Sequence, residues 1–361
     1  MPAWVRDITL FVKASGPHLD LIEFEKMVDR LAELVDPTKT LLYFGAWMEG
    51  GDWWTEGSAA HHPDYYPKPN LGACVEAAHR HGFRVMLGTI VHGCSPSHPL
   101  YPHFQQYQYR DTWTGELRGE CLDGSCQPPL YPLAHISPAS AEWRNLFVSN
   151  LKAVWEEYPV DAFFLDASHT VINDGNGLID GLNMGQGMVL LHKELAEAMP
   201  GIVLGGERLH EATFVHESFA QRPFLSRTLQ PHPISTFLFS PFVQAIALRG
   251  AHPLHLEPLH DLLRYGEIWD VMPTITLWGT GNLDDKYVEI HHVLDLAGTY
   301  QPRYGLNADV NGDGVVDILD LSLVEQNFGA ILNHPEADIN GDGQVNVLDL
   351  ILVANRFYGK F

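Results

Sequence analysis

Short apolar runs along the first three hundred positions of the chain alternate with longer amphipathic stretches. The runs indicate buried strands at residues 8–12, 40–46, 84–90, 162–166, 202–206, 224–228, 235–239 and 274–278. Several of the stretches between them repeat apolar residues every three to four positions, as one face of a helix does, at 21–35, 71–81, 139–158 and 187–199. This alternation predicts parallel βα units.

The number of these units distinguishes two α/β architectures. About eight strands, each followed by room for a helix, suit a (β/α)8 TIM barrel. A doubly wound open sheet is the competing fold, but no Gly-x-Gly-x-x-Gly turn follows any of the strands. We therefore predict an α/β chain with a TIM barrel over residues 1–298.

The last part of the chain repeats itself. Residues 308–321 align with 337–350, so that Asp309 corresponds to Asp338, 29 positions later. In each copy an acidic loop precedes a stretch with apolar residues at helical spacing. The repeat predicts a small all-α module of paired loop–helix units.

Both loops carry oxygen ligands at the spacing of a calcium loop, where positions 1, 3, 5, 9 and 12 give side chains and position 7 a backbone carbonyl. Glycine occupies position 6 in both copies. We predict two Ca²⁺ ions, because without a cation so many carboxylates would repel one another; acidic loops without a metal are the alternative. The expected ligands are Asp309, Asn311, Asp313, Val315, Asp317 and Asp320, then Asp338, Asn340, Asp342, Gln344, Asn346 and Asp349.

The doubled Asp-x-Asn-x-Asp-Gly loop, with one helix after each copy, resembles a dockerin domain over residues 305–361. Residues 299–304 would then be a short linker. The resemblance implies docking onto a cohesin-type scaffold or a cell-surface protein through loop positions 10 and 11. Ile318-Leu319 and Val347-Leu348 stand there instead of the hydroxyl pair of many dockerins. A calcium module that only supports the barrel is the alternative.

Composition narrows the choice of partners. The formal net charge of −23 argues against nucleic acid or an anionic membrane, since both need a basic surface. No uninterrupted apolar stretch is long enough to span a membrane. No signal peptide is visible in the given sequence, which is compatible with a truncated N-terminus. Of the four cysteines, Cys121 and Cys126 either bridge or stay as free thiols. With a dockerin-like module, an extracellular or cell-surface location is expected.

Two apolar strands end in a carboxylic acid. Asp166 closes the run 162–166, and Glu207 follows 202–206 directly. In a TIM barrel the carboxyl ends of the strands form the active site, so acids at two neighbouring strand ends can lie on either side of one bond. Glycoside hydrolysis needs such a pair, one acid and one nucleophile or base. Otherwise, Asp166 would cap a helix, and Glu207 would form a surface ion pair with Arg208.

The run Phe-Leu-Asp166-Ala-x-His169, followed by Gly-Glu207, resembles the barrels of α-amylase-type and related retaining glycosidases. The resemblance implies that Asp166 is the nucleophile and Glu207 the acid/base. The arginine that α-amylases carry two positions before the nucleophile is Phe164 here. A less characterised, glycosidase-like barrel family is therefore the closer expectation.

The loop after the second predicted strand is rich in aromatic residues. Aromatic faces stack on sugar rings, while nearby Asp, His and Arg side chains bind hydroxyls; packing of this loop onto the barrel is the alternative. No His-Glu-x-x-His motif occurs, so we expect no cofactor for the barrel. We predict a glycoside hydrolase for a poly- or oligosaccharide; a non-catalytic carbohydrate-binding or surface-assembly protein is the alternative. The expected substrate-binding residues are Trp47, Trp53, Trp54, Asp64, Tyr65, His92, His169 and Arg208.

Overall fold

A computed structural model describes most of the chain, and its described residues form two compact units. All described residues from 308 to 358 belong to the second unit. The predicted limits 1–298, 299–304 and 305–361 stay a prediction, because residues 301–307 lie outside the described part. The described residues are 3–14, 21–50, 59–121, 131–208, 210–222, 239, 242–247, 251, 271–300, 308–313, 315–329, 335–339 and 343–358.

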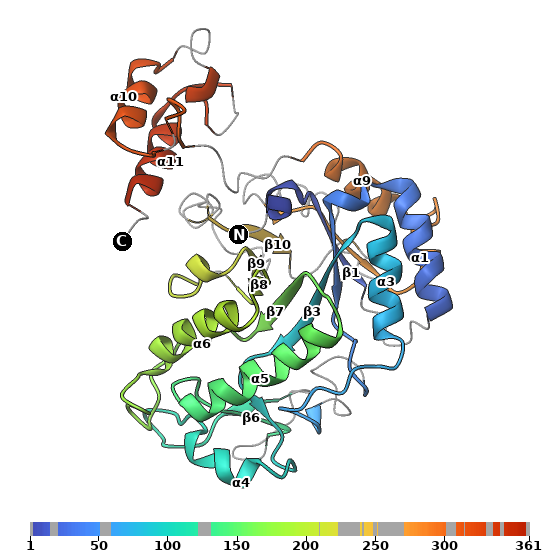
Figure 1. Ribbon diagram of the computed structural model, residues 1–361, viewed down its shortest axis with the longest axis vertical. Coiled ribbons are helices and arrows are strands. Elements are labelled where there is room, and N and C mark those ends of the chain that lie inside the picture. Colours follow the sequence, from blue (N-terminus) through green and yellow to red (C-terminus); the bar gives the residue numbers. More distant parts are fainter. Residues whose placement is uncertain are drawn as a thin grey trace. The chain divides into compact units, whose positions relative to one another are not determined.

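The first unit is built on a parallel sheet that curls into a barrel (Figure 1). Neighbouring strands pair in parallel throughout, from β1 through β2, β3, β7, β8, β9 and β10 to β11, with β12 on the other side of β1. The strands are β1 (Leu10–Ala14), β2 (Thr40–Phe44), β3 (Arg84–Ile90), β7 (Ala162–Asp166), β8 (Val203–Gly206), β9 (Phe219–Arg222), β10 (Gln244–Ala247), β11 (Val271–Met272) and β12 (Thr274–Leu277).

One extended segment closes the barrel. β11 pairs with β10 and β12 pairs with β1, and only Pro273 separates the two short strands. Proline has no N–H to donate to a neighbouring strand, which interrupts the segment, yet the Pro273 carbonyl still accepts from the Phe11 N–H at 2.9 Å. Since β11 and β12 together fill the eighth position, the predicted (β/α)8 architecture is confirmed.

The structure agrees with six of the eight predicted strands to within a few residues and differs at the other two. The described sixth and seventh strands are β9 and β10. Residues 224–228 and 235–238, where the apolar pattern predicts them, lie outside the described part of the chain.

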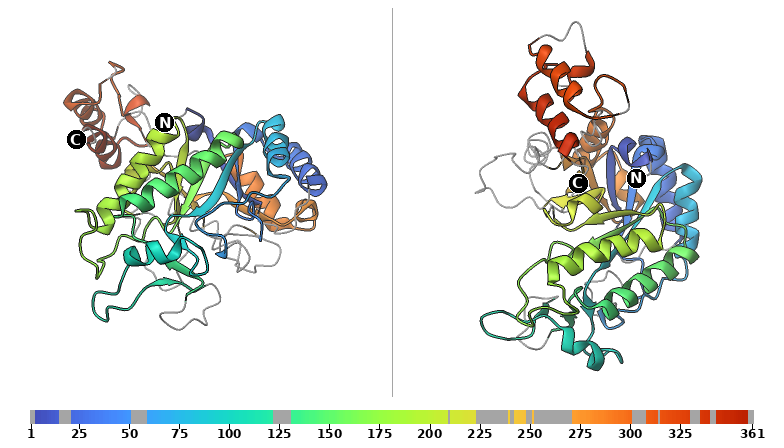
Figure 2. Two further views of the ribbon diagram at one scale, coloured as in Figure 1. Left: turned by 60° about the horizontal axis from the view of Figure 1, so that its bottom comes forward. Right: turned by 60° about the vertical axis from the view of Figure 1, so that its left-hand side comes forward.

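Helices cover the outer face of the sheet, as Figures 1 and 2 show. α1 packs on α3, and α5 packs on α6. The predicted helices correspond to α1 (Leu21–Leu34), α3 (Leu71–His81), α5 (Ala141–Glu157) and α6 (Met184–Ala198), and the unit also contains α4 (Tyr101–Phe104), α9 (Val288–Ala297) and the 3-10 turns Ala3–Asp7, Pro37–Lys39, Gln105–Tyr107, Phe214–His216 and Thr280–Leu283.

Side chains of the strands alternate between the helix layer and the barrel interior. Leu10 and Val12 of β1 lie in the large core cluster with the helices, whereas Phe11 is buried outside that cluster. Inside the barrel the Tyr43 ring lies between the rings of Phe11 and Phe164, with centroids 5.9 and 5.6 Å away. Asp166 shares the face of Phe164, so its side chain points to the interior at the carboxyl end of β7.

A small antiparallel sheet follows β3 and stands at the carboxyl end of the barrel. It contains β4 (Gly93–Cys94), β5 (Gly119–Glu120) and β6 (Leu133–His135), in the order β4–β6–β5. The described residues between β3 and α5 thus form a folded subdomain. Cys121, next to β5, is disulfide-bonded, while Cys74 and Cys94 are free.

The second unit consists of α10 (Ile318–Gln326), α11 (Val347–Tyr358) and the 3-10 turn Pro335–Ala337. α10 packs on α11. Val324 and Val353, which occupy equivalent positions of the repeat, are both fully buried in its small core. Asp317 caps α10, and Asp320 three residues later completes a reciprocal capping box. The predicted pair of loop–helix repeats is confirmed.

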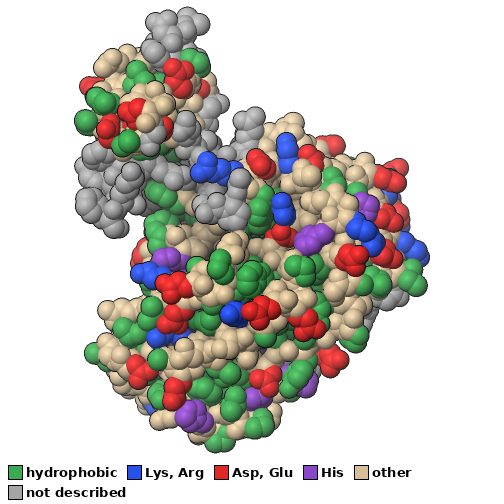
Figure 3. Space-filling model, viewed as in Figure 1, with side chains coloured by type: hydrophobic (Ala, Val, Ile, Leu, Met, Phe, Trp, Pro, Cys, Tyr) green, Lys and Arg blue, Asp and Glu red, His purple; other side chains and the backbone are tan. Residues whose placement is uncertain are grey.

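The lengths of the apolar helices and the side chains on the surface bear on the partners of the protein. No helix among the described residues is both long and apolar enough to cross a membrane. In the view of Figure 3, acidic side chains are common on the barrel and stand beside hydrophobic ones on the second unit.

Candidate functional site

Asp166 and Glu207 meet at the carboxyl end of the barrel. Asp166 is the last residue of β7, and Glu207 directly follows β8, the neighbouring strand. Their side chains form a hydrogen bond with each other. The structure therefore brings together the two acids for which the sequence predicts one site. Their chemical roles stay a prediction.

Glu207 is held from several sides. Its Oε2 atom accepts a hydrogen bond of 3.0 Å from the Ala167 N–H and lies 3.1 Å from Nδ1 of His169. Its Oε1 atom lies 3.8 Å from Nε of Arg208. Only 19% of the Glu207 side chain is exposed. These contacts fix the orientation of the carboxylate and favour its charged form.

The pKa values of the two carboxyl groups are shifted in opposite directions. Burial, the charge of Glu207 and the hydrogen bond to it raise the pKa of Asp166 well above its ordinary value. Burial also acts to raise the pKa of Glu207, but the contact with His169 and the hydrogen bonds from Ala167 and Asp166 outweigh it and lower that pKa. When the pair holds one proton, these opposite shifts favour Asp166 over Glu207 as the residue that carries it. A pair separated in this way suits acid–base chemistry.

The backbone at both acids is strained. Ala167, after Asp166, has a φ of 62°, and Arg208, after Glu207, has a φ of 59°. Residues with a side chain seldom adopt this left-handed conformation, and it is concentrated at functional sites. The surrounding structure therefore overcomes a local cost at the two positions that aim the carboxyl groups.

Sequence reasoning missed a third acid beside this pair. Glu120 of β5 comes from the subdomain after β3, and burial together with the charge of Glu207 raises its pKa, while His169 opposes the shift. Its Oε2 atom lies 3.6 Å from Nε2 of His135. Nothing in the sequence distinguishes Glu120, because its position depends on how a fifty-residue excursion folds back over the barrel.

Two histidines beside Glu120 are buried and neutral. The rings of His92 and His135 lie 4.1 Å apart between centroids. Burial lowers the pKa of His135 to about 3, and burial with the neighbouring His135 and His169 lowers the pKa of His92. Both ring nitrogens of His92 lack a hydrogen-bond partner within the described residues. His92, just after β3, thus has two ring nitrogens that could form hydrogen bonds with a ligand.

The predicted substrate-binding residues divide into two groups. His169 and Arg208 contact Glu207 directly, and His92 belongs to the histidine cluster beside them. Their predicted contact with sugar hydroxyls stays a prediction. The second group is the aromatic loop after β2, of which Trp53 and Trp54 lie outside the described residues.

The described part of that loop packs onto the barrel. Trp47 is 3% exposed, and its indole donates a 2.6 Å hydrogen bond to the Gly88 carbonyl. The hydroxyl of Tyr65 bonds to that of Thr89. Asp64 accepts from His98 at 3.1 Å. The Trp47 ring belongs to the hydrophobic core in this structure, and its predicted contact with a sugar stays a prediction.

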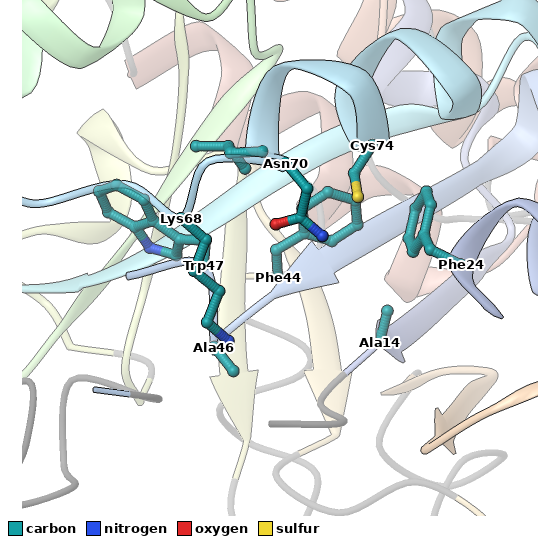
Figure 4. Close-up of a pocket in the computed structure, with 9 residues that line it drawn as sticks. Ala14, Phe24, Phe44, Ala46, Trp47, Lys68, Asn70 and Cys74 are labelled. Atoms are coloured by element: carbon teal, nitrogen blue, oxygen red, sulfur yellow. The ribbon is translucent and has the colours of Figure 1, made fainter. Parts of the chain in front are cut away.

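A small apolar pocket opens beside this loop, over the carboxyl ends of β1 and β2 (Figure 4). Phe24, Phe44 and Cys74 come together around it, and Lys68 and Asn70 supply its polar edge. Such a lining suits an apolar group better than a hydroxyl-rich ring.

A second pair of ionisable side chains is buried beneath α6. His192 and Glu217 are both fully buried, and Nε2 of His192 lies 3.1 Å from Oε1 of Glu217. The other ring nitrogen, Nδ1, lies 2.8 Å from the Met188 carbonyl, which only accepts, so Nδ1 carries a hydrogen. The Glu217 carboxyl occupies the space that a Cβ at Gly206 would need, 2.1 Å from Oε1. Gly206 is therefore required just before Glu207.

Carboxylates in the acidic loops of the second unit accept hydrogen bonds from backbone N–H groups. Asp320, fully buried, accepts from the N–H groups of Val310, Asn311 and Asp317 at 2.7–3.1 Å. Oδ1 of Asp338, the predicted first-position ligand of the second loop, is buried without a partner among the described residues. Within the described part no three His, Cys, Asp or Glu side chains already converge on one point. An orphaned buried carboxylate oxygen fits a cation there.

Some of the predicted ligands fall outside this test. Asn340 and Asp342 lie outside the described residues, so the second loop is seen only in part. At loop positions 10 and 11, the side chains are exposed in both copies: 59% and 57% for Ile318 and Leu319, and 57% and 39% for Val347 and Leu348. An apolar surface of this kind on a small unit is typical of an interaction site.

Comparisons with known proteins agree with this division. Residues 307–358 match the sequence profile of the dockerin type I domain. Dockerin type I domains bind calcium and dock onto cohesin scaffolds. No curated protein sequence matches the chain.

Solved structures similar to the barrel are α-galactosidases. Two are family 36 (GH36) α-galactosidases of Geobacillus stearothermophilus, AgaA with a TM-score of 0.53 and AgaB with 0.56, both at 12% identity. The alignments cover 81% and 82% of this chain but only 42% of each enzyme. The α-galactosidase of Thermus thermophilus, with p-nitrophenyl α-D-galactopyranoside, gives a TM-score of 0.55 at 11% identity and covers 80% of this chain and 62% of the enzyme.

At such low identity these structures establish the fold alone. The chain has a TIM-barrel fold similar to that of these α-galactosidases, and its residues 307–358 match the dockerin type I domain.

Proposed function

We propose that the barrel is a glycoside hydrolase that acts on a poly- or oligosaccharide through Asp166 and Glu207. The observation that carries this proposal is the hydrogen-bonded carboxyl pair at neighbouring strand ends, in which the pKa of Asp166 is raised and that of Glu207 is lowered. One acid to protonate a leaving oxygen and one carboxylate to attack or activate water are the requirements of glycoside hydrolysis. His169 and Arg208 flank the pair and are proposed to bind sugar hydroxyls.

The resting proton lies on the opposite residue from the roles that the α-amylase resemblance implies. Asp166 as nucleophile must be ionised, and Glu207 as acid must carry the proton. The direct hydrogen bond between them is a one-step path for that transfer. A bound sugar that brings an acceptor close to Glu207 and positive character close to Asp166 would favour the transfer.

The separation of the two groups supports a competing function. Retaining glycosidases hold their carboxyl groups roughly 5–5.5 Å apart and inverting ones roughly 6.5–9.5 Å, and a mutual hydrogen bond is shorter than either. Hydrolysis therefore requires the substrate to part them. A carbohydrate-binding barrel without turnover requires no such movement and is the second candidate.

Turnover distinguishes the two functions. Wild type, Asp166→Asn, Glu207→Gln and the surface control Asp29→Asn would be incubated with a panel of α- and β-glycans, and reducing ends would be measured. The enzyme proposal expects hydrolysis of at least one glycan, a loss of roughly 100-fold or more in kcat for both site variants, and none for the control. Glycan binding without hydrolysis by wild type would establish the second candidate instead.

Azide rescue assigns the roles within the pair. If Asp166 is the nucleophile, Asp166→Gly with azide gives a glycosyl azide of inverted anomeric configuration, because azide attacks the substrate directly. If Glu207 is the acid/base, Glu207→Ala with azide gives the retained configuration, because azide attacks the glycosyl-enzyme. The reverse pattern would exchange the two roles, and rescue of neither, with an activated aryl glycoside as substrate, would count against both assignments.

We further propose that the dockerin domain binds two Ca²⁺ ions and docks through its exposed apolar residues at loop positions 10 and 11. The orphaned Asp338 oxygen and the exposure of Ile318 and Val347 support this proposal. Calorimetry with CaCl₂ after removal of metal should give two sites per chain. One site or none would contradict the ligand assignment, and unchanged cohesin binding by Leu319→Asp and Leu348→Asp together would contradict the surface.

The proposed location is extracellular or on the cell surface. Dockerin domains occur in extracellular or surface-anchored proteins. The disulfide at Cys121 is consistent with an oxidising compartment.

A further inference from the structure

The subdomain after β3 presents one tryptophan almost entirely to solvent. Trp113 is 94% exposed, whereas large aromatic side chains normally contribute to folding by being buried. It sits in a turn, 111–115, between residues 110 and 117, which form an antiparallel bridge. The indole therefore adds nothing to the core that would account for its presence.

The turn that carries Trp113 is rigid. Oδ1 of Asp111 accepts from the N–H groups of Trp113 and Thr114, both at 2.9 Å, and Oδ2 accepts from Arg118 at 2.6 Å. The Asp111 N–H and carbonyl close the turn with Glu116 and Gly115, also at 2.9 Å. A ring on such a fixed backbone loses little entropy when a ligand stacks on it.

The turn is also connected to the carboxyl site. The loop that begins at Asp166 runs past residues 174–176, which bind Arg110: Asp174 accepts from the Arg110 N–H at 3.0 Å and Asn176 from its Nε at 3.1 Å. The Gly175 N–H donates to the Arg110 carbonyl at 2.9 Å. Eight residues from Asp166 to Asp174 span at most roughly 29 Å. Trp113 and the carboxyl pair thus belong to connected loops at the same end of the barrel.

We propose that Trp113 is a stacking platform for a neutral carbohydrate polymer, a binding site separate from the carboxyl pair. The apolar face of a pyranose ring packs on an indole, and Asp111 and Thr114 of the same turn carry polar side chains of the kind that bind hydroxyls. The inference rests on the proposed carbohydrate function of the barrel. It extends that function from the sugar that is cleaved to the polymer that carries it.

Affinity electrophoresis of the whole chain tests the platform without relying on turnover. Native gels would contain soluble starch, galactomannan, xylan or mixed-linkage β-glucan. Wild type should be retarded in at least one of them, Trp113→Ala should bind that polymer about tenfold more weakly, and Trp113→Phe should keep most of the affinity. Leu178→Ala, which removes another exposed apolar side chain of the adjoining loop, is the matched control and should bind as wild type does.

Two further measurements separate this proposal from the catalytic one. Asp166→Asn should still be retarded, and Trp113→Ala should keep wild-type turnover of whichever aryl glycoside wild type cleaves, if it cleaves one. Retardation of wild type by none of the four polymers, or equal retardation of wild type and Trp113→Ala, would overturn the platform. So would binding that disappears in Asp166→Asn but persists in Trp113→Ala. Loss of glycoside turnover in every variant would count against the enzyme alone.

Discussion

The carboxylate of Glu207 is bonded to the backbone of the residue that follows Asp166. Oε2 of Glu207 accepts the Ala167 N–H at 3.0 Å, and Ala167 adopts a left-handed conformation that turns this N–H toward it. The second acid thereby helps to fix the strand end that carries the first. Replacing either one will affect the other, so each site variant needs a measure of stability beside its measure of activity.

Asp166→Asn should stabilise the protein at neutral pH. The folded-state pKa of Asp166 is raised, so its contribution to stability is complete below its unfolded-state pKa, about 3.9, and is lost as pH rises through the folded value. Asparagine keeps the shape and a donor to Glu207 but cannot ionise. A gain of about 1 kcal/mol would raise the melting temperature by roughly 2–4 °C.

Thermal unfolding of wild type and Asp166→Asn from pH 4 to pH 8 measures this difference. The two melting temperatures should diverge as pH rises, with the variant higher. A constant difference over the whole range would show that folding does not raise the pKa of Asp166.

Glu120→Gln should shift the pH dependence of the site without abolishing it. The negative charge of Glu120 contributes to the raised pKa of Asp166, so its removal should lower that pKa. The limb of the kcat/KM profile that reports Asp166 should move to lower pH. Glu116→Gln, on the same subdomain but outside this cluster, is the control; a profile unchanged by Glu120→Gln would separate Glu120 from the pair.

Gly206→Ala should be far more harmful than Gly205→Ala, one residue earlier. A Cβ at Gly206 would lie 2.1 Å from Oε1 of the fully buried Glu217, whereas at Gly205 its nearest neighbour is the flexible end of Met86 at 3.1 Å. Overpacking of this kind costs typically about 1–3 kcal/mol. Chemical denaturation would compare the two variants, and equal losses would mean that Glu217 can move aside.

His192→Ala should destabilise the barrel by about 3–5 kcal/mol, because it leaves Glu217 buried without its charged or proton-sharing partner. Glu217→Gln should cost less, since the amide still donates to Nε2. A double-mutant cycle of His192→Leu and Glu217→Leu tests the coupling: the double variant should lose far less stability than the sum of these two replacements made singly. Additive losses would indicate that the pair is not a unit.

Asp320→Ala should unfold the dockerin domain more readily than Asp320→Asn, even without calcium. The carboxylate receives three backbone N–H groups, and alanine leaves all three unpaired in a buried place. Far-UV circular dichroism of the whole chain in excess EGTA measures the loss of helix. Hydrogen exchange of the backbone amides of this domain then shows whether the loss lies there. Equal protection in both variants would assign Asp320 to calcium alone.

How far the sequence anticipates the molecule depends on the range of the interactions involved. The barrel strands through β8 and the four helices rest on local periodicity, and the loop repeat rests on identity between its copies. β9 and β10 lie outside the predicted runs. Each has only four residues and contains a buried glutamine, Gln221 or Gln244, which interrupts the apolar pattern on which the prediction rests.

The site shows the same limit. Asp166 and Glu207 could be found because a parallel barrel gathers the residues at its strand ends. Glu120, His135 and Glu217 could not, because folding of a long excursion and of the helix layer places them. Sugar binding by Trp47 stays a prediction, because an aromatic residue in a loop looks the same in sequence whether the loop lies open or packs onto the barrel.

The divided strand β11–β12 has a consequence for how the protein is made. β1 pairs with β12 through Phe11 and Thr274, which are 263 positions apart in the chain. At 5–20 residues per second, about 13–53 s pass before the ribosome supplies that partner. Throughout this time one side of β1 is an open sheet edge, a template for pairing with other nascent chains. Production of this protein should therefore depend on chaperone capacity during synthesis more than the stability of the finished barrel would suggest.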